Sequence, residues 1–452
     1  MTDSSALIEQ YSNSFSNLSE SFIGKNIEWV KESREKAFKQ FYKDGVPRQD
    51  VEEWNTFSYR GIYDNFFANS SEQMDKKIVD KLKPRDKNCP VRMVFYNGKM
   101  VKLEEDEPIK GVKINSLKYF LDNCPELIEG KIPDASFYSE HRLSKVIDSR
   151  PQGLVALNAA FYQDGAVILV DKNTIVPGYI EIIHIGNASK ISMSPVRSVV
   201  SLSKNSKCEV VERIVPTEEK TPLYLSNHVT DIELSRFSSL TYLRLVDGNA
   251  SDIHVNSIHA LVNENAELYC PSVIKSQGQS RIESRANLLG IKSNAKIDGL
   301  TILNKESISE SLTRVMHCTE NSTSDQTFRT ILSDNSKASF LGKIRVEKSA
   351  DGTNAIMSSK SLLLSENARA NAKPELEILA DDVKCSHGVT VGSFNPDQIF
   401  YLRSRGISEK NAKQLLTNAF SKIVIDSLPV ALSKVSEKFI GVDDHKLEVI
   451  DK

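Results

Sequence analysis

The sequence predicts a mainly β protein in which a β-solenoid is flanked by helical regions. Three observations predict this order. Apolar residues recur at steps of three and four near the N-terminus, short β-type runs follow one another from about residue 153, and a helical pattern returns after residue 394. We therefore divide the chain into a helical domain with its connection at 1–150, a solenoid core at 151–394 and a C-terminal helical domain at 395–452.

Two N-terminal helices are expected. The first is indicated by apolar residues that share one face, and Gly24 ends it; a second stops near Asp44-Gly45 and Pro47. Frequent prolines up to Pro151 indicate a less regular connection to the solenoid. The apolar residues of the first face are Ile8, Tyr11, Phe15, Leu18 and Phe22.

The β region is a series of short runs separated by corners. Between Pro222 and Pro374 there is one proline, Pro271, and no convincing helical periodicity. Asn followed by a small residue recurs between runs, and Asn tolerates the left-handed backbone of a sharp corner. Reused corners favour a solenoid, with a sandwich or barrel as the alternative. The Asn corners are Asn187, Asn205, Asn249, Asn265, Asn294, Asn335 and Asn367.

The C-terminal helices are marked by their caps. Asn395-Pro396 fits a helix start, Gly406 a helix end, and Ser408 a second cap. The next helix carries an apolar stripe that must be buried on the solenoid or on a partner. Its members are Ala412, Leu415, Leu416, Ala419 and Phe420.

Composition narrows the function. The 452 residues carry 58 Lys+Arg against 60 Asp+Glu, a net charge of -2, which gives little support to binding of nucleic acid or of an anionic membrane. No apolar run approaches the roughly 18–20 residues of a membrane span, and the N-terminus does not resemble a secretory signal. We expect a cytoplasmic protein. The six dispersed cysteines exclude a C-x-x-C pair and are expected to be reduced and mostly buried.

Three motifs near the C-terminus carry a specific resemblance. They are P-x-L-E-I-x-A-D-D-V at 374–383, C-S-H-G-V-T-V-G at 385–392 and Y-L-R-S-R-G-I at 401–407. Weaker agreement lies in L-N-A-A-F at 157–161 and in G-V-P-R-Q-D-V-E-E-W at 45–54. Together they make the chain resemble the SufB/SufD family of iron–sulfur cluster assembly scaffolds. The resemblance touches all three regions and is strong in the last.

Within that family the C-S-H-G form resembles the SufD branch. The SufB form has a glutamate after the histidine, where this chain has Gly388. SufB also has a functional cysteine at the position that corresponds to Ala368. Both departures argue against a chain that accepts sulfur by the SufB route.

The resemblance implies a right-handed parallel β-helix between helical segments. It implies pairing with a SufB-type chain through the end of the β-helix, and a transient iron–sulfur cluster at that interface. Sulfur would come indirectly from a cysteine desulfurase system, and reduced flavin is a candidate further component. It also implies docking of a SufC-type ABC ATPase on the C-terminal helices, at Ile407 and the apolar stripe. This chain has no P-loop, so ATP hydrolysis would belong to the partner.

His387 is the first candidate ligand for cluster or metal, because a neutral imidazole binds iron. Cys385 lies two residues earlier, so on a strand both side chains share a face, although a buried structural thiol is an equal alternative. Asp381-Asp382 is expected to be a solvated turn. His317-Cys318 is expected to be structural, since neighbours on a strand diverge. No catalytic residue is assigned.

Two other function classes remain open. β-Helices also host carbohydrate-active enzymes, although no groove-like cluster of Asp, Glu and Arg stands out in 240–345. A β-helical structural or adhesion protein is a further alternative. The leading interpretation is a non-catalytic scaffold subunit.

Overall fold

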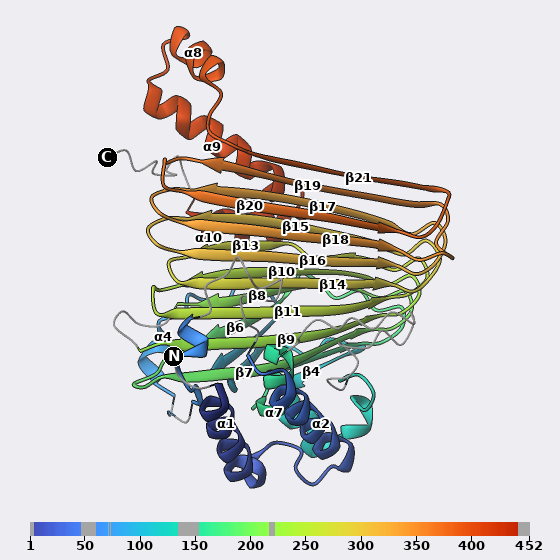
Figure 1. Cartoon of the computed structure of the whole chain (residues 1–452). Helices are drawn as coiled ribbons and strands as arrows, with labels where there is room; N and C mark the ends of the chain where they lie inside the picture. The colour runs from blue at the N-terminus through green and yellow to red at the C-terminus, as the bar shows by residue number, and fades with distance from the viewer. Residues whose placement is uncertain are drawn as a thin grey trace.

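The computed structural model describes residues 4–46, 60–70, 72, 74–133, 153–216 and 222–441. The chain is mostly β, with 44% of residues in strands, and its centre is a β-solenoid of about 7 turns with helices at both ends (Figure 1). Every described pairing in which both strands are β5 or later is parallel, which confirms the predicted solenoid and excludes the sandwich. No described helix has the length and apolar character of a membrane span.

Two long sheets form the walls of the solenoid, and successive strands alternate between them. Sheet A runs through β4 (Val112–Ser116), β5 (Ala166–Val170), β7 (Ser192–Leu202), β9 (Tyr224–Leu234), β11 (Asp252–Val262), β14 (Gln279–Leu288), β16 (Ile308–His317), β18 (Lys337–Val346) and β20 (Arg369–Ile378). Sheet B runs through β3 (Lys99–Glu105), β2 (Val91–Tyr96), β6 (Ile180–Ile185), β8 (Lys207–Val215), β10 (Ser239–Gly248), β12 (Glu267–Tyr269), β15 (Asn294–Leu303), β17 (Thr323–Leu332), β19 (Thr353–Leu363) and β21 (Val383–Gly392). Two short strands, β1 (Ala68–Asn69) and β13 (Ser272–Ser276), pair at the side of these paths.

Alternate residues of both sheets point into the lumen and form one continuous core along the solenoid. Ile182, Val210 and Ile232 fill it near the N-terminal end, and Phe328 and Phe340 meet in it further along, with ring centroids 4.4 Å apart. Helices cover parts of the outer faces, and strands such as β5 and β6 are buried on both faces.

One row of corners explains how the coils stack. Each residue of the row has a positive φ, and its backbone N–H donates to a carbonyl of the next coil, as Asn205 does to Arg236 at 3.2 Å. The prediction of left-handed Asn corners is confirmed at Asn205 and Asn265 and is wrong for the other five predicted positions, which have no positive φ. The row contains Asn173, Asn205, Phe237, Asn265, Lys292 and Asn321.

The N-terminal helices are α1 (Ser4–Leu18), α2 (Glu28–Asp44) and α7 (Gly153–Phe161), with the short α3 (Arg60–Tyr63), α4 (Lys76–Asp80), α5 (Leu117–Asn123), η1 (Ser19–Ser21) and η3 (Pro125–Leu127). Tyr11, Phe41 and Phe161 pack together and against the outer face of sheet A. Asn158 in α7 anchors this packing, because its amide donates to the carbonyls of Val196 and Asn227, each at 2.8 Å.

The predicted irregular connection contains regular structure. Three strands, β2, β3 and β4, lie within residues predicted to be a helical domain and its connection, and they extend both sheets. The frequent prolines in this segment hide these short strands in the sequence. Residues 47–54 of the weaker motif at 45–54 lie outside the described residues.

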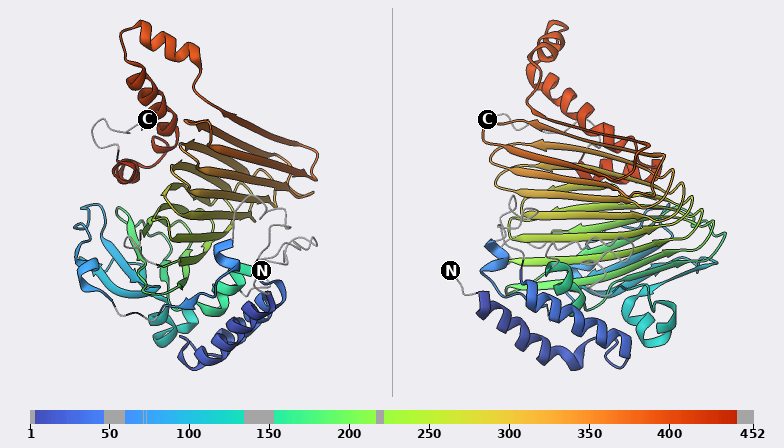
Figure 2. Two further views of the ribbon diagram at one scale, coloured as in Figure 1. Left: turned by 60° about the vertical axis from the view of Figure 1, so that its left-hand side comes forward. Right: turned by 45° about the vertical axis from the view of Figure 1, so that its right-hand side comes forward.

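The C-terminal helices are α8 (Pro396–Ser404), α9 (Glu409–Ile425) and α10 (Val430–Ile440). The predicted caps are confirmed: the Asn395 side chain accepts from the N–H of Asp397 at 2.8 Å, and Ser408 accepts from that of Asn411 at 3.3 Å. Val424 and Leu432 pack on the outer face of sheet B. The helix α8, by contrast, projects beyond the last coil (Figures 1 and 2).

Candidate functional site

The last coil of the solenoid ends in two open edges. β20 is the terminal strand of sheet A and β21 that of sheet B, and no described strand pairs with their outer sides. Figure 1 shows β21 as the final rung, with α8 standing clear of it. Unpaired N–H and C=O groups along such edges favour addition of a further strand.

His387 and Cys385 both lie on β21, and the strand register fixes their direction. His387 pairs with Met357 and Cys385 with Ala355, two residues buried in the core. Paired residues in a parallel sheet point the same way, so both side chains face the lumen side, as the sequence predicts for residues two apart. His387 is exposed because no further coil lies above it.

The thiol of Cys385 is only partly accessible. It packs against the core, and burial raises the pKa of the thiol, which the backbone hydrogen bond with Ala355 only partly offsets. The neutral thiol therefore predominates at neutral pH, and a bound metal ion would be needed to favour the thiolate.

Exposed apolar side chains occur at the same open end as His387. Ile378 on β20 is 40% exposed, and Val389 and Val391 on β21 are 39% and 42% exposed. Val389 and Val391 share the lumen-facing side of β21 with His387, since they follow it at steps of two. The open end therefore combines unpaired backbone, exposed apolar surface and one imidazole.

The neighbouring candidates behave as predicted. Asp381 and Asp382 are exposed in the turn between β20 and β21. His317 is fully buried, with Nδ1 2.8 Å from Ser322 Oγ and Nε2 2.9 Å from Ser324 Oγ, so it is structural. Gly388 faces open space, because a Cβ there would meet nothing within 4 Å.

Ala368, the position compared with the SufB cysteine, is fully buried against Leu303 and Leu332. The six cysteines are free; Cys89, Cys208 and Cys270 are buried, so the prediction that most are buried holds for three of them.

Among the described residues, one group of three His, Cys, Asp or Glu side chains has its ligand atoms within 4.8 Å of one another: His184, Glu212 and His228. His387 and Cys385 do not belong to such a group. Sequence reasoning missed this lumen group because its members come from separate coils. No local spacing reports their proximity, and only the stacking of the coils brings them together.

The predicted partner-binding stripe on α9 is divided by the structure. Ala412 is fully buried, and Leu416, Phe420 and Ile407 are half-buried. Leu415 is 50% exposed and Ala419 is exposed; Ile423, one turn further, is also 50% exposed. These three residues lie four apart and form one exposed face of α9. On α8, Phe400 is 74% and Tyr401 57% exposed.

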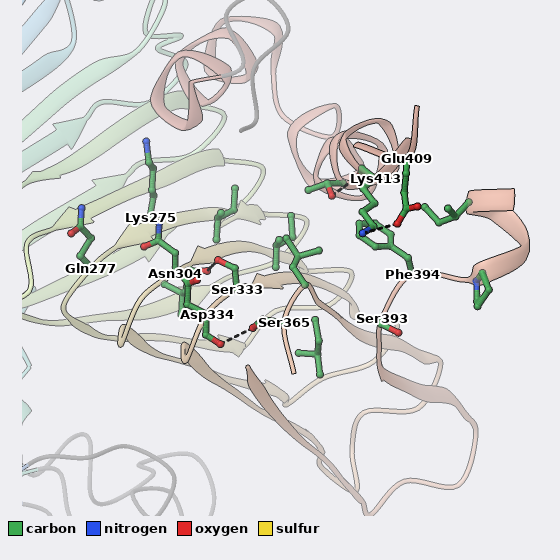
Figure 3. A pocket seen from close by; sticks show the side chains of 18 of the residues that line it. Lys275, Gln277, Asn304, Ser333, Asp334, Ser365, Ser393, Phe394, Glu409 and Lys413 are labelled. Carbon is green, nitrogen blue, oxygen red and sulfur yellow. Dashed lines mark hydrogen bonds and ion pairs between the residues drawn. The ribbon is translucent and has the colours of Figure 1, made fainter. Parts of the chain in front are cut away.

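A groove of about 660 Å³ separates these helices from the edge of the solenoid. Figure 3 shows Glu409 and Lys413 of α9 across the groove from Asn304, Ser333 and Asp334 of the solenoid corners. Glu409 forms ion pairs with Lys413 at 3.1 Å and with Arg403 of α8 at 3.3 Å, so it links α8 to α9.

Comparison with known proteins gives consistent matches along the chain. The family model "SUF system FeS cluster assembly, SufBD core domain" matches residues 184–420, and "SufBD protein N-terminal region" matches residues 5–182. The iron-sulfur cluster assembly protein SufD of Escherichia coli is 25% identical over 396 residues, which cover 86% of this chain and 87% of the relative.

Two further relatives agree. SufD of Bacillus subtilis is 24% identical over 430 residues, 93% of this chain and 94% of the relative. Protein ABCI7, chloroplastic, of Arabidopsis thaliana is 24% identical over 381 residues, 76% of this chain and 79% of the relative. With a core-domain match over more than half of its length, the chain belongs to the SufBD family of iron–sulfur cluster assembly proteins and is a homologue of SufD.

Proposed function

We propose that this chain is a non-catalytic scaffold subunit that works in the cytoplasm. It pairs with a SufB-type chain through β20 and β21, and iron–sulfur cluster is built at that junction as cargo. The observation that carries the proposal is the open last coil, where unpaired strand edges, exposed Ile378, Val389 and Val391, and the imidazole of His387 occur together.

A homologous solenoid is the partner that this end fits best. Strand addition requires an extended edge of matching rise and twist, which a second parallel β-helix supplies. Capping would also remove the exposed apolar residues from water, at roughly 25 cal/mol per Å² of apolar area buried.

The ligand set at this end supports a shared site. His387 is exposed and Cys385 half-buried on the same face, and the described residues add no third His, Cys, Asp or Glu to them. A cluster here would need ligands from the partner chain. Mixed imidazole and thiolate ligation from two chains would allow the cluster to be released once it is complete.

The C-terminal helices are proposed to dock a SufC-type ABC ATPase. Leu415, Ala419 and Ile423 form an exposed face on α9, and Phe400 and Tyr401 lie exposed on α8. Exposed apolar groups of this extent on two adjacent helices are typical of a protein interface. A cysteine desulfurase system supplies sulfur indirectly in this scheme, and reduced flavin is a candidate component of the complex.

The proposal is tested with His387→Ala in the full complex. The chain is co-expressed with the SufB-type and SufC-type proteins of its host, and the complex is reconstituted anaerobically with iron and sulfide. We expect His387→Ala to lower cluster content at least about tenfold, measured by Mössbauer and ultraviolet–visible spectroscopy, because an exposed ligand is lost. Size-exclusion chromatography should show the complex intact.

Cys385→Ser is the matched control. It should lower cluster content less, since the thiol is partly buried and its pKa is raised. Full cluster content in His387→Ala, or dissociation of its complex, would make the histidine structural and refute the shared site. If the chain co-purified with neither the SufB-type nor the SufC-type protein, the scaffold role would be refuted and the alternative of a β-helical enzyme would be favoured.

A further inference from the structure

A group of three ionisable side chains lies inside the solenoid, far from the open end. His184 on β6 and Glu212 on β8 come from sheet B, and His228 on β9 comes from sheet A. They are 4%, 1% and 1% exposed. These strands belong to the first coils, whereas β21 forms the last (Figure 1). The group is therefore separate from the interface proposed above.

The contacts within the group leave ligand atoms unused. Glu212 Oε1 lies 3.1 Å from His184 Nε2, and Oε2 accepts from the Asn256 amide at 3.1 Å. His228 Nδ1 is 3.8 Å from Glu212 Oε1, beyond hydrogen-bond distance, and the two imidazole rings have centroids 4.2 Å apart.

Three ring nitrogens of this group are buried and have no hydrogen-bond partner among the described residues: Nδ1 of His184 and both nitrogens of His228. A buried polar atom without a partner costs roughly 1–3 kcal/mol. Two imidazoles face the same carboxylate here, and three of their ring nitrogens make no hydrogen bond to a described residue. Packing alone does not explain this arrangement.

We infer that His184, Glu212 and His228 bind a divalent first-row transition metal ion inside the solenoid, where it links sheet A to sheet B. Two imidazoles and a carboxylate form a donor set that suits Zn²⁺ and Fe²⁺ alike. With ligands this buried, the ion does not exchange with the open end. Its role is structural, and it enters as the chain folds.

The protonation states agree with this assignment. Burial, together with the nearby His184, lowers the pKa of His228 to about 4, so its imidazole is neutral and has a free lone pair at pH 7. Burial by itself would raise the pKa of Glu212, but the hydrogen bond from His184 and the proximity of His228 outweigh it and hold that pKa well below its usual range.

One buried charge opposes a cation. Arg244, 1% exposed, lies next to the group, but its guanidinium donates to Asn256 Oδ1 at 3.1 Å, so the Asn256 side chain stands between it and Glu212. Arg244 also donates to the carbonyl of Glu283 at 2.9 Å and to Ser284. The positive charge of Arg244 lowers the affinity of the site for the metal ion. Strong chelators are therefore left out after refolding, because they would remove the ion.

The full chain and three variants test the site. Wild type, His228→Leu, Glu212→Gln and the control His387→Ala are unfolded in guanidinium with chelator and refolded with Zn²⁺, or with Fe²⁺ under anaerobic conditions. After desalting, bound metal is measured by inductively coupled plasma mass spectrometry. We expect about one ion per wild-type and His387→Ala chain and at least about tenfold less in the other two.

Thermal unfolding separates a metal site from a polar packing arrangement. Refolding with metal, compared with refolding without it, should raise the Tm of wild type and leave that of His228→Leu unchanged. Wild type that retains no metal and shows no shift in Tm would overturn the inference. The inference would also be overturned if metal-free His228→Leu were more stable than wild type with metal. Removal of the unpaired ring nitrogens would then stabilise the fold without any need for an ion. If His228→Leu fails to fold by circular dichroism, Glu212→Gln, which keeps the shape of the side chain, decides the question.

Discussion

At the scale of single residues, the same residue type has different roles in different coils. His387 is exposed on the last strand, where a partner chain can reach it. His317 is buried between two serines that satisfy both of its ring nitrogens. His228 is buried with neither nitrogen hydrogen-bonded. Function therefore follows from the position in the stack.

His317 makes stability depend on pH. Burial lowers its pKa from 6.5 to about 4, so the unfolded chain binds a proton more readily than the folded chain between these values. Folding is favoured above pH 6.5, and this stabilisation is lost as pH falls from 6.5 toward 4. A shift of this size corresponds to about 3 kcal/mol.

We expect His317→Gln to reduce the loss of Tm between pH 6.5 and pH 4.5, measured by differential scanning calorimetry. The other buried histidines keep the remainder of the pH dependence. His387→Gln, at an exposed position, is the control and should leave the curve unchanged. An unchanged curve in His317→Gln would show that the histidine is not held neutral by the fold.

At the scale of elements, α9 has one face that packs on the solenoid and one that is exposed. Val424 and Ile425 fix the helix to sheet B, whereas Leu415, Ala419 and Ile423 remain exposed. The sequence pattern predicts one apolar stripe that must be buried on the solenoid or on a partner. In the structure Ala412 is buried, whereas Leu415 and Ala419 are exposed, and the pattern does not separate these two kinds of position.

This division gives a paired prediction. Leu415→Asp should weaken binding of the SufC-type ATPase at least about tenfold, because it places a charge within the proposed interface. Its circular dichroism and Tm should match wild type, since the side chain is half exposed. Binding is measured by isothermal titration calorimetry.

Ala412→Asp serves as the contrasting variant. It puts a carboxylate into a fully buried position and should lower the free energy of unfolding by roughly 2–4 kcal/mol. Normal ATPase binding by Leu415→Asp would remove α9 from the docking surface. Equal destabilisation by both variants would show that the two faces are not distinct.

At the scale of the whole molecule, the two ends of the solenoid differ in how they are covered. The N-terminal helices and the antiparallel strands β3 and β4 close the first coils. The last coil has no such cover among the described residues, and α8 projects past it (Figure 2). The first coils are thus flanked by helices, although β3 and β4 also end their sheets, whereas the last coil is uncovered among the described residues.

A charge on the open edge should block this pairing. Val391→Lys places an ammonium group on the lumen-facing side of β21 and should weaken association with the SufB-type chain at least about tenfold. It should also reduce any self-association of the isolated chain. Sedimentation velocity measures both.

Thr390→Lys is the matched control, because alternation along β21 directs its side chain to the outer face. It should pair as wild type does. If both lysine variants pair normally, the partner does not use this edge, and the proposed position of the cluster would have to move.

The order of helix, solenoid and helix can be predicted from the sequence, because short apolar runs and helix caps are local signals. Asn395 and Ser408 could be assigned as caps for that reason, and the shared face of Cys385 and His387 follows from the period of two in a strand. Strands β2 to β4 are not predicted by the sequence pattern, because their pairing partners lie far along the chain.

The remaining features depend on how the coils stack on one another. Phe237 and Lys292 adopt the left-handed conformation, as do Asn residues of the same row, because each corner must align with the corner of the next coil. His184, Glu212 and His228 meet only because three strands of the first coils surround the same stretch of lumen. Coil length and stacking set such contacts, and these arise from long-range packing that no local pattern encodes.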